Sequence, residues 1–293
     1  MKAVVLALGL TLVPVLAQGT PARAEDRIAV VAAENFYGDI ARQIGGERVS
    51  VISIMNNPDQ DPHLFETTPA IVRQLAGAQV VILNGANYDP WMDKLLAAAP
   101  RANRTVISAA QLTGRKAGEN PHLWYDPVTM PAVATALAEA LAKTDSAHAP
   151  DYAARLQTAL ASLERVAQRV AQLKVKHAGT VVTATEPVFG PMAQALGLTM
   201  RNERFQLAMM NDTEPSARDV AAFERDLKER KVKVLIYNSQ VSEKLTERLR
   251  DIAAKSKVPV IGVTETMPPN VSFQDWVLGE LDALDKALTG PNS

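Results

Sequence analysis

Residues 151–176 read DYAARLQTALASLERVAQRVAQLKVK and form the longest helical pattern in the chain. Apolar residues recur in it at steps of three and four, which places them on one face of a helix. These residues are Tyr152, Leu156, Leu160, Leu163, Ala167 and Val170. At 1.5 Å per residue the helix would be roughly 39 Å long. Since that length crosses a whole domain, we expect the helix to join two units.

Short apolar runs alternate with helical patterns on both sides of this helix. Before it, we expect strands at 27–33, 49–55, 79–83 and 105–108, with helices at 36–44, from 68 onward, at 90–98 and at 131–143. After it, we expect strands at 180–185, 232–237 and 258–264, with helices at 191–196, 213–230, 242–255 and 273–288. Such alternation predicts an α/β fold with mostly parallel sheets.

The predicted architecture is two Rossmann-like α/β lobes joined by one long helix. The expected boundaries are an N-terminal lobe at 25–148, a linking helix at 149–178 and a C-terminal lobe at 179–293. Residues 1–24 begin with Met1 and Lys2, continue as an apolar stretch and end in Ala22-Arg23-Ala24. This pattern is typical of a secretory signal peptide, which predicts a periplasmic protein.

Composition excludes several classes of site. The chain has no cysteine, so disulfides, thiolate nucleophiles and Cys-ligated metals are not available. Loss of the signal peptide would remove two of 31 basic residues and none of 32 acidic ones, which changes the formal net charge from −1 to −3. No basic stripe indicates nucleic-acid binding. Any metal must therefore be held by nitrogen and oxygen ligands.

Two of the four histidines occur in matching frames. Residues 61–65 read DPHLF and residues 120–124 read NPHLW, with His63 and His122 at the centre. The proline before each histidine stiffens the loop, and a rigidly held neutral imidazole suits a metal ion. The alternative is that each histidine packs in its loop and bonds the backbone. His148 and His177 lack such a frame, and we expect both to face solvent.

Two acids follow predicted strands of the second half. Glu186 comes directly after 180–185, and Glu265 comes directly after 258–264. In open α/β sheets, ligands collect outside the carboxyl ends of the strands. Both histidine loops leave the same edge of the first sheet, so the four side chains should meet in the cleft between the lobes. Each acid could instead be a helix cap or a surface residue.

A hydrolase is one alternative. His63 and Glu66 form an H-x-x-E motif, which occurs often by chance, and Glu66 also suits the start of the helix that Thr68-Pro69 opens. A secreted metal-dependent hydrolase would use His63, Glu66 and His122. The chain contains no H-E-x-x-H, G-x-S-x-G, P-loop or dinucleotide-binding motif.

The two frames resemble a known family. Residues 62–69 match P-H-x-x-E-x-T-P and residues 120–127 match N-P-H-x-W-x-D-P. Together with the long helix and Glu186, these motifs resemble the cluster A-I solute-binding proteins of zinc, manganese and iron ABC importers. The resemblance covers nearly the whole mature chain. It implies a monomeric protein that captures a metal ion between its lobes, catalyses no reaction, and delivers the ion to an ABC permease with its ATPase.

The resemblance also implies a ligand set. The family's first two ligands correspond to His63 and His122, and its third corresponds to Glu186. Its fourth ligand is usually an Asp after a later strand, where this chain has Glu265; Asp275 is a second candidate inside a helical pattern.

The chain has no histidine-rich loop at 111–120, which zinc-type members often carry. Two imidazoles with two carboxylates lean towards Mn²⁺ or Fe²⁺, whereas affinity in solution favours Zn²⁺. A binding protein for a metal chelate or siderophore stays an alternative, which a roomy aromatic cleft would favour.

Overall fold

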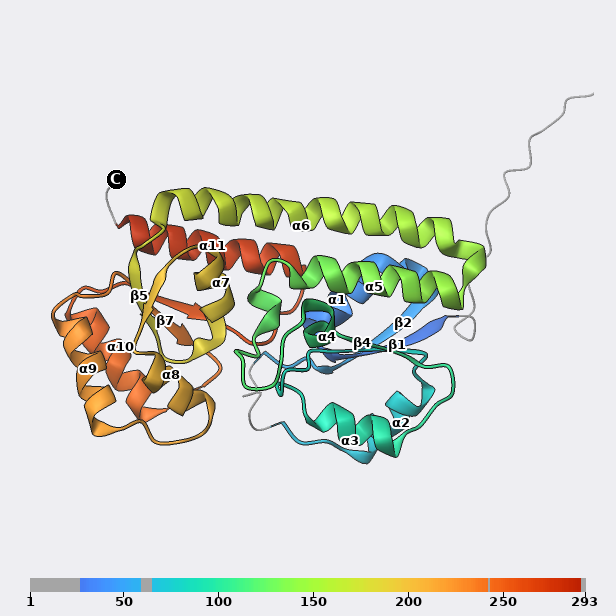
Figure 1. The fold of residues 1–293 in the computed structure, drawn as a ribbon, viewed down its shortest axis with the longest axis horizontal. Coiled ribbons are helices and arrows are strands. Elements are labelled where there is room, and N and C mark those ends of the chain that lie inside the picture. Colours follow the sequence, from blue (N-terminus) through green and yellow to red (C-terminus); the bar gives the residue numbers. More distant parts are fainter. Residues whose placement is uncertain (1–26, 59–64, 242, 291–293) are drawn as a thin grey trace, which may run out of the picture.

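The computed structural model describes residues 27–58, 65–241 and 243–290, and these fold into two α/β lobes (Figure 1). The expected signal peptide and His63 lie outside the described residues. The first lobe contains β1 (Ile28–Glu34), α1 (Asn35–Gly45), η2 (Gly46–Arg48), β2 (Val49–Met55), α2 (Pro69–Gly77), β3 (Val80–Leu83), α3 (Trp91–Ala98), β4 (Thr105–Ser108), α4 (Ala109–Thr113), η4 (Leu123–Tyr125), α5 (Thr129–Thr144) and η5 (Ser146–His148).

The long helix α6 (Ala149–His177) leads into the second lobe. That lobe contains β5 (Val181–Ala184), η6 (Pro187–Phe189), α7 (Gly190–Ala195), β6 (Thr199–Arg201), α8 (Glu203–Met210), α9 (Ala217–Lys228), β7 (Leu235–Asn238), α10 (Lys244–Lys255), β8 (Val260–Val263) and α11 (Phe273–Thr289).

Each lobe is built on a four-stranded parallel sheet. The strand orders are β2-β1-β3-β4 and β6-β5-β7-β8, so both lobes have the same topology. All four residues of β3 are buried, as expected for a parallel strand with helices on both faces. In each lobe the chain passes to one side of its first strand and then crosses to the other side. The loops after these strands define the edge where a ligand would bind.

Two long helices connect the lobes. Figure 1 shows α6 running along one side of both lobes with α11, from the end of the chain, beside it. Between them, Arg169 of α6 lies 2.7 Å from a carboxylate oxygen of Asp282 and 2.9 Å from one of Asp285. Lys176 and His177 also contact Asp285, at 2.7 Å and 2.8 Å. The second lobe is therefore fixed along the connecting helix.

An aromatic cluster continues the core from one lobe to the other. The ring of Trp276 in α11 lies 6.1 Å from Phe36 of α1 and 5.6 Å from Tyr125 of η4, between ring centroids. Tyr125 in turn packs edge-on against Phe189 of the second lobe at 5.1 Å. All four side chains are buried. Because one packed core spans the boundary, large hinge motions between the lobes would expose apolar surface at a cost in free energy.

The structure confirms the predicted fold class and differs from the sequence analysis in detail. The sequence patterns do not predict β6, α8 or the short helix α4. The prediction that His177 faces solvent is wrong, because its side chain is buried against Asp285 where α6 ends. His148 is partly exposed and pairs with Asp145 at 2.8 Å. Among the described residues, no helix is both long and apolar enough to span a membrane.

Candidate metal centre

His122 is held in its loop from two sides. The side-chain amide of Asn84, at the end of β3, donates to the carbonyl of Pro121 at 2.8 Å. Asn120 Oδ1 accepts from the backbone N–H of His122 at 3.0 Å and lies 2.8 Å from its Nδ1. Since Asn120 Nδ2 donates to another carbonyl at 2.7 Å, the oxygen faces the imidazole and Nδ1 is assigned as the protonated nitrogen. His122 is 1% exposed.

Glu265 brings the second lobe to that imidazole. It lies two residues beyond the end of β8 and is fully buried. Its Oε2 is 3.4 Å from His122 Nε2, the unprotonated nitrogen in this tautomer. Tyr88 donates its hydroxyl to the same Oε2 at 3.0 Å. Burial raises the pKa of Tyr88 well above its ordinary value, and the nearby Glu265 raises it further, so the hydroxyl stays a donor.

One amide joins the two carboxylates of the second lobe. Asn238, the last residue of β7, donates from Nδ2 to Glu265 Oε1 at 2.6 Å and to Glu186 Oε2 at 3.1 Å. Glu186 is 3% exposed and lies two residues beyond β5. The two carboxylates are therefore no further apart than the sum of those distances. Strand ends of one parallel sheet thus bring together both acids that the sequence places there.

The remaining predicted residues have other positions. His63 lies outside the described residues. Glu66 is exposed, and Asp275 is an exposed residue of the first turn of α11, where its backbone N–H and carboxylate bond Ser272. In the described part of the chain no group of three or more His, Cys, Asp or Glu residues has the spacing of a metal site. His122 and the two carboxylates are near one another, but Asn238 and Tyr88 bond the carboxylate oxygens.

Sequence reasoning missed the polar residues that hold these ligands. Asn238 ends a buried strand, so the rule that singled out Glu186 would also have found it. Gln240 accepts from the backbone N–H groups of Glu265 and Thr266 and fixes the loop after β8. Tyr88 lies in an irregular loop, and no pattern in the sequence directs it to Glu265.

Two further buried acids, Asp89 and Glu34, lie near Tyr88. Asp89 accepts from the backbone N–H groups of Asn84 and Gly85, both at 2.7 Å, and burial raises its pKa to about 6. Glu34, the last residue of β1, is fully buried, and burial with the nearby Asp89 raises its pKa well above the usual range. Burial therefore favours the neutral form of the Glu34 carboxyl group over its charged form.

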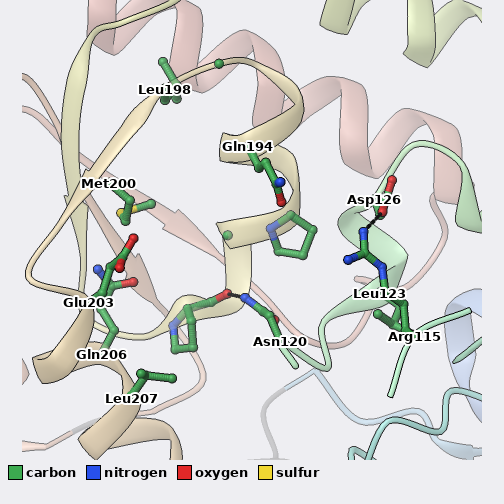
Figure 2. A pocket seen from close by; sticks show the side chains of 14 residues that line it. Arg115, Asn120, Leu123, Asp126, Gln194, Leu198, Met200, Glu203, Gln206 and Leu207 are labelled. Carbon is green, nitrogen blue, oxygen red and sulfur yellow. Dashed lines mark hydrogen bonds and ion pairs between the residues drawn. The ribbon is translucent and has the colours of Figure 1, made fainter. Parts of the chain in front are cut away.

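Two cavities lie beside the loop that carries His122. One of 610 Å³ borders His122 and is lined by Phe65, Tyr88 and Trp91 from the first lobe and by α8 residues that include Leu207 and Met210. The other, of 470 Å³, lies between the loop around Asn120 and helices α7 and α8 (Figure 2). Both aliphatic and polar side chains line this second cavity, including Leu198, Met200, Leu207, Arg115, Gln194 and Glu203.

Comparison with known proteins gives a consistent result. The model of the family "Zinc-uptake complex component A periplasmic" matches residues 30–287. The zinc-binding protein TroA of Treponema pallidum is 26% identical over 82% of this chain and 80% of its own length. The manganese-binding lipoprotein MntA of Bacillus subtilis is 25% identical over 75% of this chain and 74% of its own.

A solved structure agrees in fold. That of the periplasmic zinc-binding protein TroA superposes with a TM-score of 0.75 at 21% identity, and covers 89% of this chain and 99% of that one. At this identity the likeness bears on the fold alone. The family match confirms the resemblance predicted from the two histidine frames.

Proposed function

Because the chain belongs to the family of periplasmic zinc-uptake components, we propose that it is the solute-binding component of an ABC importer for a divalent transition-metal ion. The proposed ligands are His63, His122, Glu186 and Glu265. The observation that carries this proposal is the 3.4 Å approach of His122 Nε2 to Glu265 Oε2 across the two lobes, with both side chains buried. Buried charges are stable when they are paired or coordinate a metal.

The chemistry of the ligand set supports this class of ion. His122 presents an unprotonated nitrogen, with its other nitrogen bonded to Asn120, which is the arrangement typical of metal-ligating histidines. Two imidazoles and two carboxylates form a harder set than three imidazoles, and they suit Mn²⁺ or Fe²⁺, whereas Zn²⁺ binds more tightly to a given set. We propose one of these three ions as the transported ligand.

The proposed mechanism is capture without turnover. Four protein ligands leave little room for the open position and reactive water of a catalytic zinc site. The core across the lobe boundary and the α6–α11 contacts limit opening, so we propose that contact with the permease releases the ion. A hydrolase that uses Glu66 has no support, since Glu66 is exposed and lies three residues before α2. We propose a non-enzymatic periplasmic monomer that works with an inner-membrane permease and its ATPase.

The test uses protein purified from the periplasm. Native mass spectrometry with elemental analysis should find one transition-metal ion per chain. In competition titrations with Zn²⁺, Mn²⁺ and Fe²⁺, His122→Ala should lower the affinity by at least about 100-fold, because even an outer-shell partner of a ligand contributes about 10- to 100-fold.

The matched control is His148→Ala, which removes a partly exposed imidazole outside the candidate centre. It should bind the metal as tightly as the wild type. Unchanged affinity in His122→Ala would mean that the site is elsewhere.

A further inference from the structure

Asn120 bonds both lobes with one side-chain amide. Its Oδ1 accepts from the backbone N–H of His122 and from Nδ1 of the same residue, at 3.0 Å and 2.8 Å. Its Nδ2 donates to the backbone carbonyl of Pro187 in the second lobe at 2.7 Å, the contact drawn as a dashed line in Figure 2. Pro187 directly follows Glu186. A single planar group therefore lies between two of the proposed ligands.

Gly190 of the second lobe leaves room for this amide. Gly190 is the first residue of α7, three residues after Pro187. A Cβ atom at Gly190 would lie 2.6 Å from Asn120 Nδ2, much closer than a real contact allows. The backbone φ of Gly190 is helical, at −55°. Its conformation therefore needs no glycine, and the close approach of Asn120 is what requires the missing side chain.

The contact with Pro187 selects one orientation of the amide. A carbonyl accepts only, so the NH₂ group must face Pro187 and the oxygen must face His122. With the amide reversed, Asn120 would put its oxygen against the Pro187 carbonyl and its NH₂ against the backbone N–H of His122. The bond between the lobes therefore fixes the acceptor beside Nδ1, and that acceptor leaves Nε2 unprotonated towards Glu265.

We propose that Asn120 is a positioning residue that couples the orientation of His122 to the position of the loop carrying Glu186. The inference rests on the proposed metal-binding function. Separation of the Pro187 loop from Asn120 removes one of the two contacts that orient the amide, and leaves only the backbone N–H of His122 to hold the acceptor beside Nδ1. Metal affinity then depends on the contact between the lobes as well as on the four ligands.

The test is a double-mutant cycle of Asn120→Ala and Gly190→Ala. Zn²⁺ affinity is measured by competition with a chromogenic chelator, and the geometry of the centre is followed by the visible spectrum of the Co²⁺-loaded protein. Asn120→Ala should weaken binding by about 10- to 100-fold, as expected for an outer-shell partner of a histidine ligand, and should change the Co²⁺ bands. Gly190→Ala, in the opposite lobe, should weaken binding in the same direction.

The double mutant gives the decisive value. Once Asn120 is gone, the added methyl group meets no amide, so Asn120→Ala/Gly190→Ala should bind no more weakly than Asn120→Ala alone. Gly279→Ala is the matched control, because a Cβ at this α11 position meets no atom within 4 Å. It should leave both affinity and spectrum unchanged. Additive losses in the cycle would overturn the coupling.

Two further results separate the possible failures. Wild-type affinity and an unchanged Co²⁺ spectrum in Asn120→Ala would overturn the positioning role while leaving the proposed function intact, provided that His122→Ala loses binding. Retention of binding by His122→Ala would instead overturn the metal site itself. If Asn120→Ala does not fold, Asn120→Asp replaces it: the carboxylate keeps an acceptor for His122 but opposes the Pro187 carbonyl, so weakened binding supports the coupling and unchanged binding overturns it.

Discussion

Tyr88 of the first lobe and Glu265 of the second are joined by a 3.0 Å hydrogen bond, and its acceptor is the oxygen that faces His122. In the proposed metal site, the hydroxyl would therefore share Glu265 Oε2 with the bound ion. Its donation stabilises a buried carboxylate in the metal-free protein. The same bond lowers the electron density that this oxygen can offer to a cation.

We expect Tyr88→Phe to destabilise the metal-free protein by about 1–3 kcal/mol, since Glu265 loses a donor in a buried site. The metal-bound protein should lose less stability, because the cation then interacts with the Glu265 oxygen that has lost its donor. Thermal unfolding with and without Zn²⁺ measures both values. The stabilisation by metal should be larger in the variant than in the wild type, and an equal or smaller increase in Tm would contradict this account.

A shorter side chain at position 265 tests whether Glu265 is the proposed fourth ligand. Glu265→Asp keeps the charge but withdraws the carboxylate by one methylene from His122, Tyr88 and Asn238. We expect metal affinity to fall at least about tenfold, because ligand geometry must be held within roughly 0.5 Å. Asp275→Glu, which changes an exposed acid of α11 in the opposite sense, serves as the control in the same titration. A Glu265→Asp protein with wild-type affinity would remove Glu265 from the ligand set.

Much of the fold follows from local sequence patterns. The buried strands β1 and β3 are continuous apolar runs, and α6 has an apolar stripe long enough to identify it as the link between lobes. In contrast, β6 is a three-residue edge strand with exposed and partly exposed side chains, so its sequence has no apolar run to detect. The path of α11 back to Phe36 depends on tertiary packing, which periodicity does not describe.

The sequence predicts part of the candidate centre, as it predicts part of the fold. The rule that strand ends of a parallel sheet share an edge singled out Glu186 and Glu265 as candidates, and the repeated frame singled out His122. The partners Asn238, Tyr88 and Asn120 act through contacts between segments far apart in the chain. His177 shows the opposite error, because Asp285, 108 residues further on, covers it. Single-sequence patterns indicate which residues are chemically capable, and the fold decides which of them meet.

Asp285 should be the main electrostatic contact between α6 and α11. Burial raises the pKa of its carboxyl, but His177, Lys176 and Arg169 outweigh that effect and hold it well below the usual range. Asp285→Ala should lower the free energy of unfolding by about 1–3 kcal/mol, between the values for exposed and buried pairs. Denaturant unfolding at pH 7 measures this. Because the pKa of Asp285 is lowered in the folded protein, its contribution to stability is lost in acid. The difference in unfolding free energy between the variant and the wild type should therefore shrink as pH falls below about 4.

The control for Asp285 is a second acid with the same partner. Asp282 also contacts Arg169, but its side chain is 65% exposed, compared with 18% for Asp285. Because solvent screens an exposed pair, Asp282→Ala should cost less than about 1 kcal/mol. Equal losses in the two variants would show that Asp285 is not the centre of this contact.

Glu280 should make stability depend on pH between about pH 4.5 and 8. Its Oε1 lies 3.0 Å from both the Tyr125 hydroxyl and Trp276 Nε1, while its enclosed Oε2 has no hydrogen-bond partner among the described residues. Burial raises its pKa to about 8, although these hydrogen bonds lower it. Tyr125 also contacts the carbonyl of Thr264 at 2.8 Å. The Tyr125 hydroxyl therefore shares its donation between Thr264 and Glu280, and burial outweighs that donation in setting the pKa of Glu280.

The direction in which stability changes with pH follows from the raised pKa of Glu280. Between about pH 4.5 and 8 the folded protein retains a proton that the unfolded chain has released, so the free energy of unfolding falls with rising pH, by at most about 1.4 kcal/mol per pH unit from this group. Glu280→Gln is neutral throughout and should remove that part of the slope, while Glu34 and Asp89 keep theirs. Unfolding free energies at pH 5, 7 and 9 test this. Glu139→Gln, on the exposed face of α5, should keep the wild-type slope, and a Glu280→Gln slope equal to it would show that Glu280 is already ionised at neutral pH.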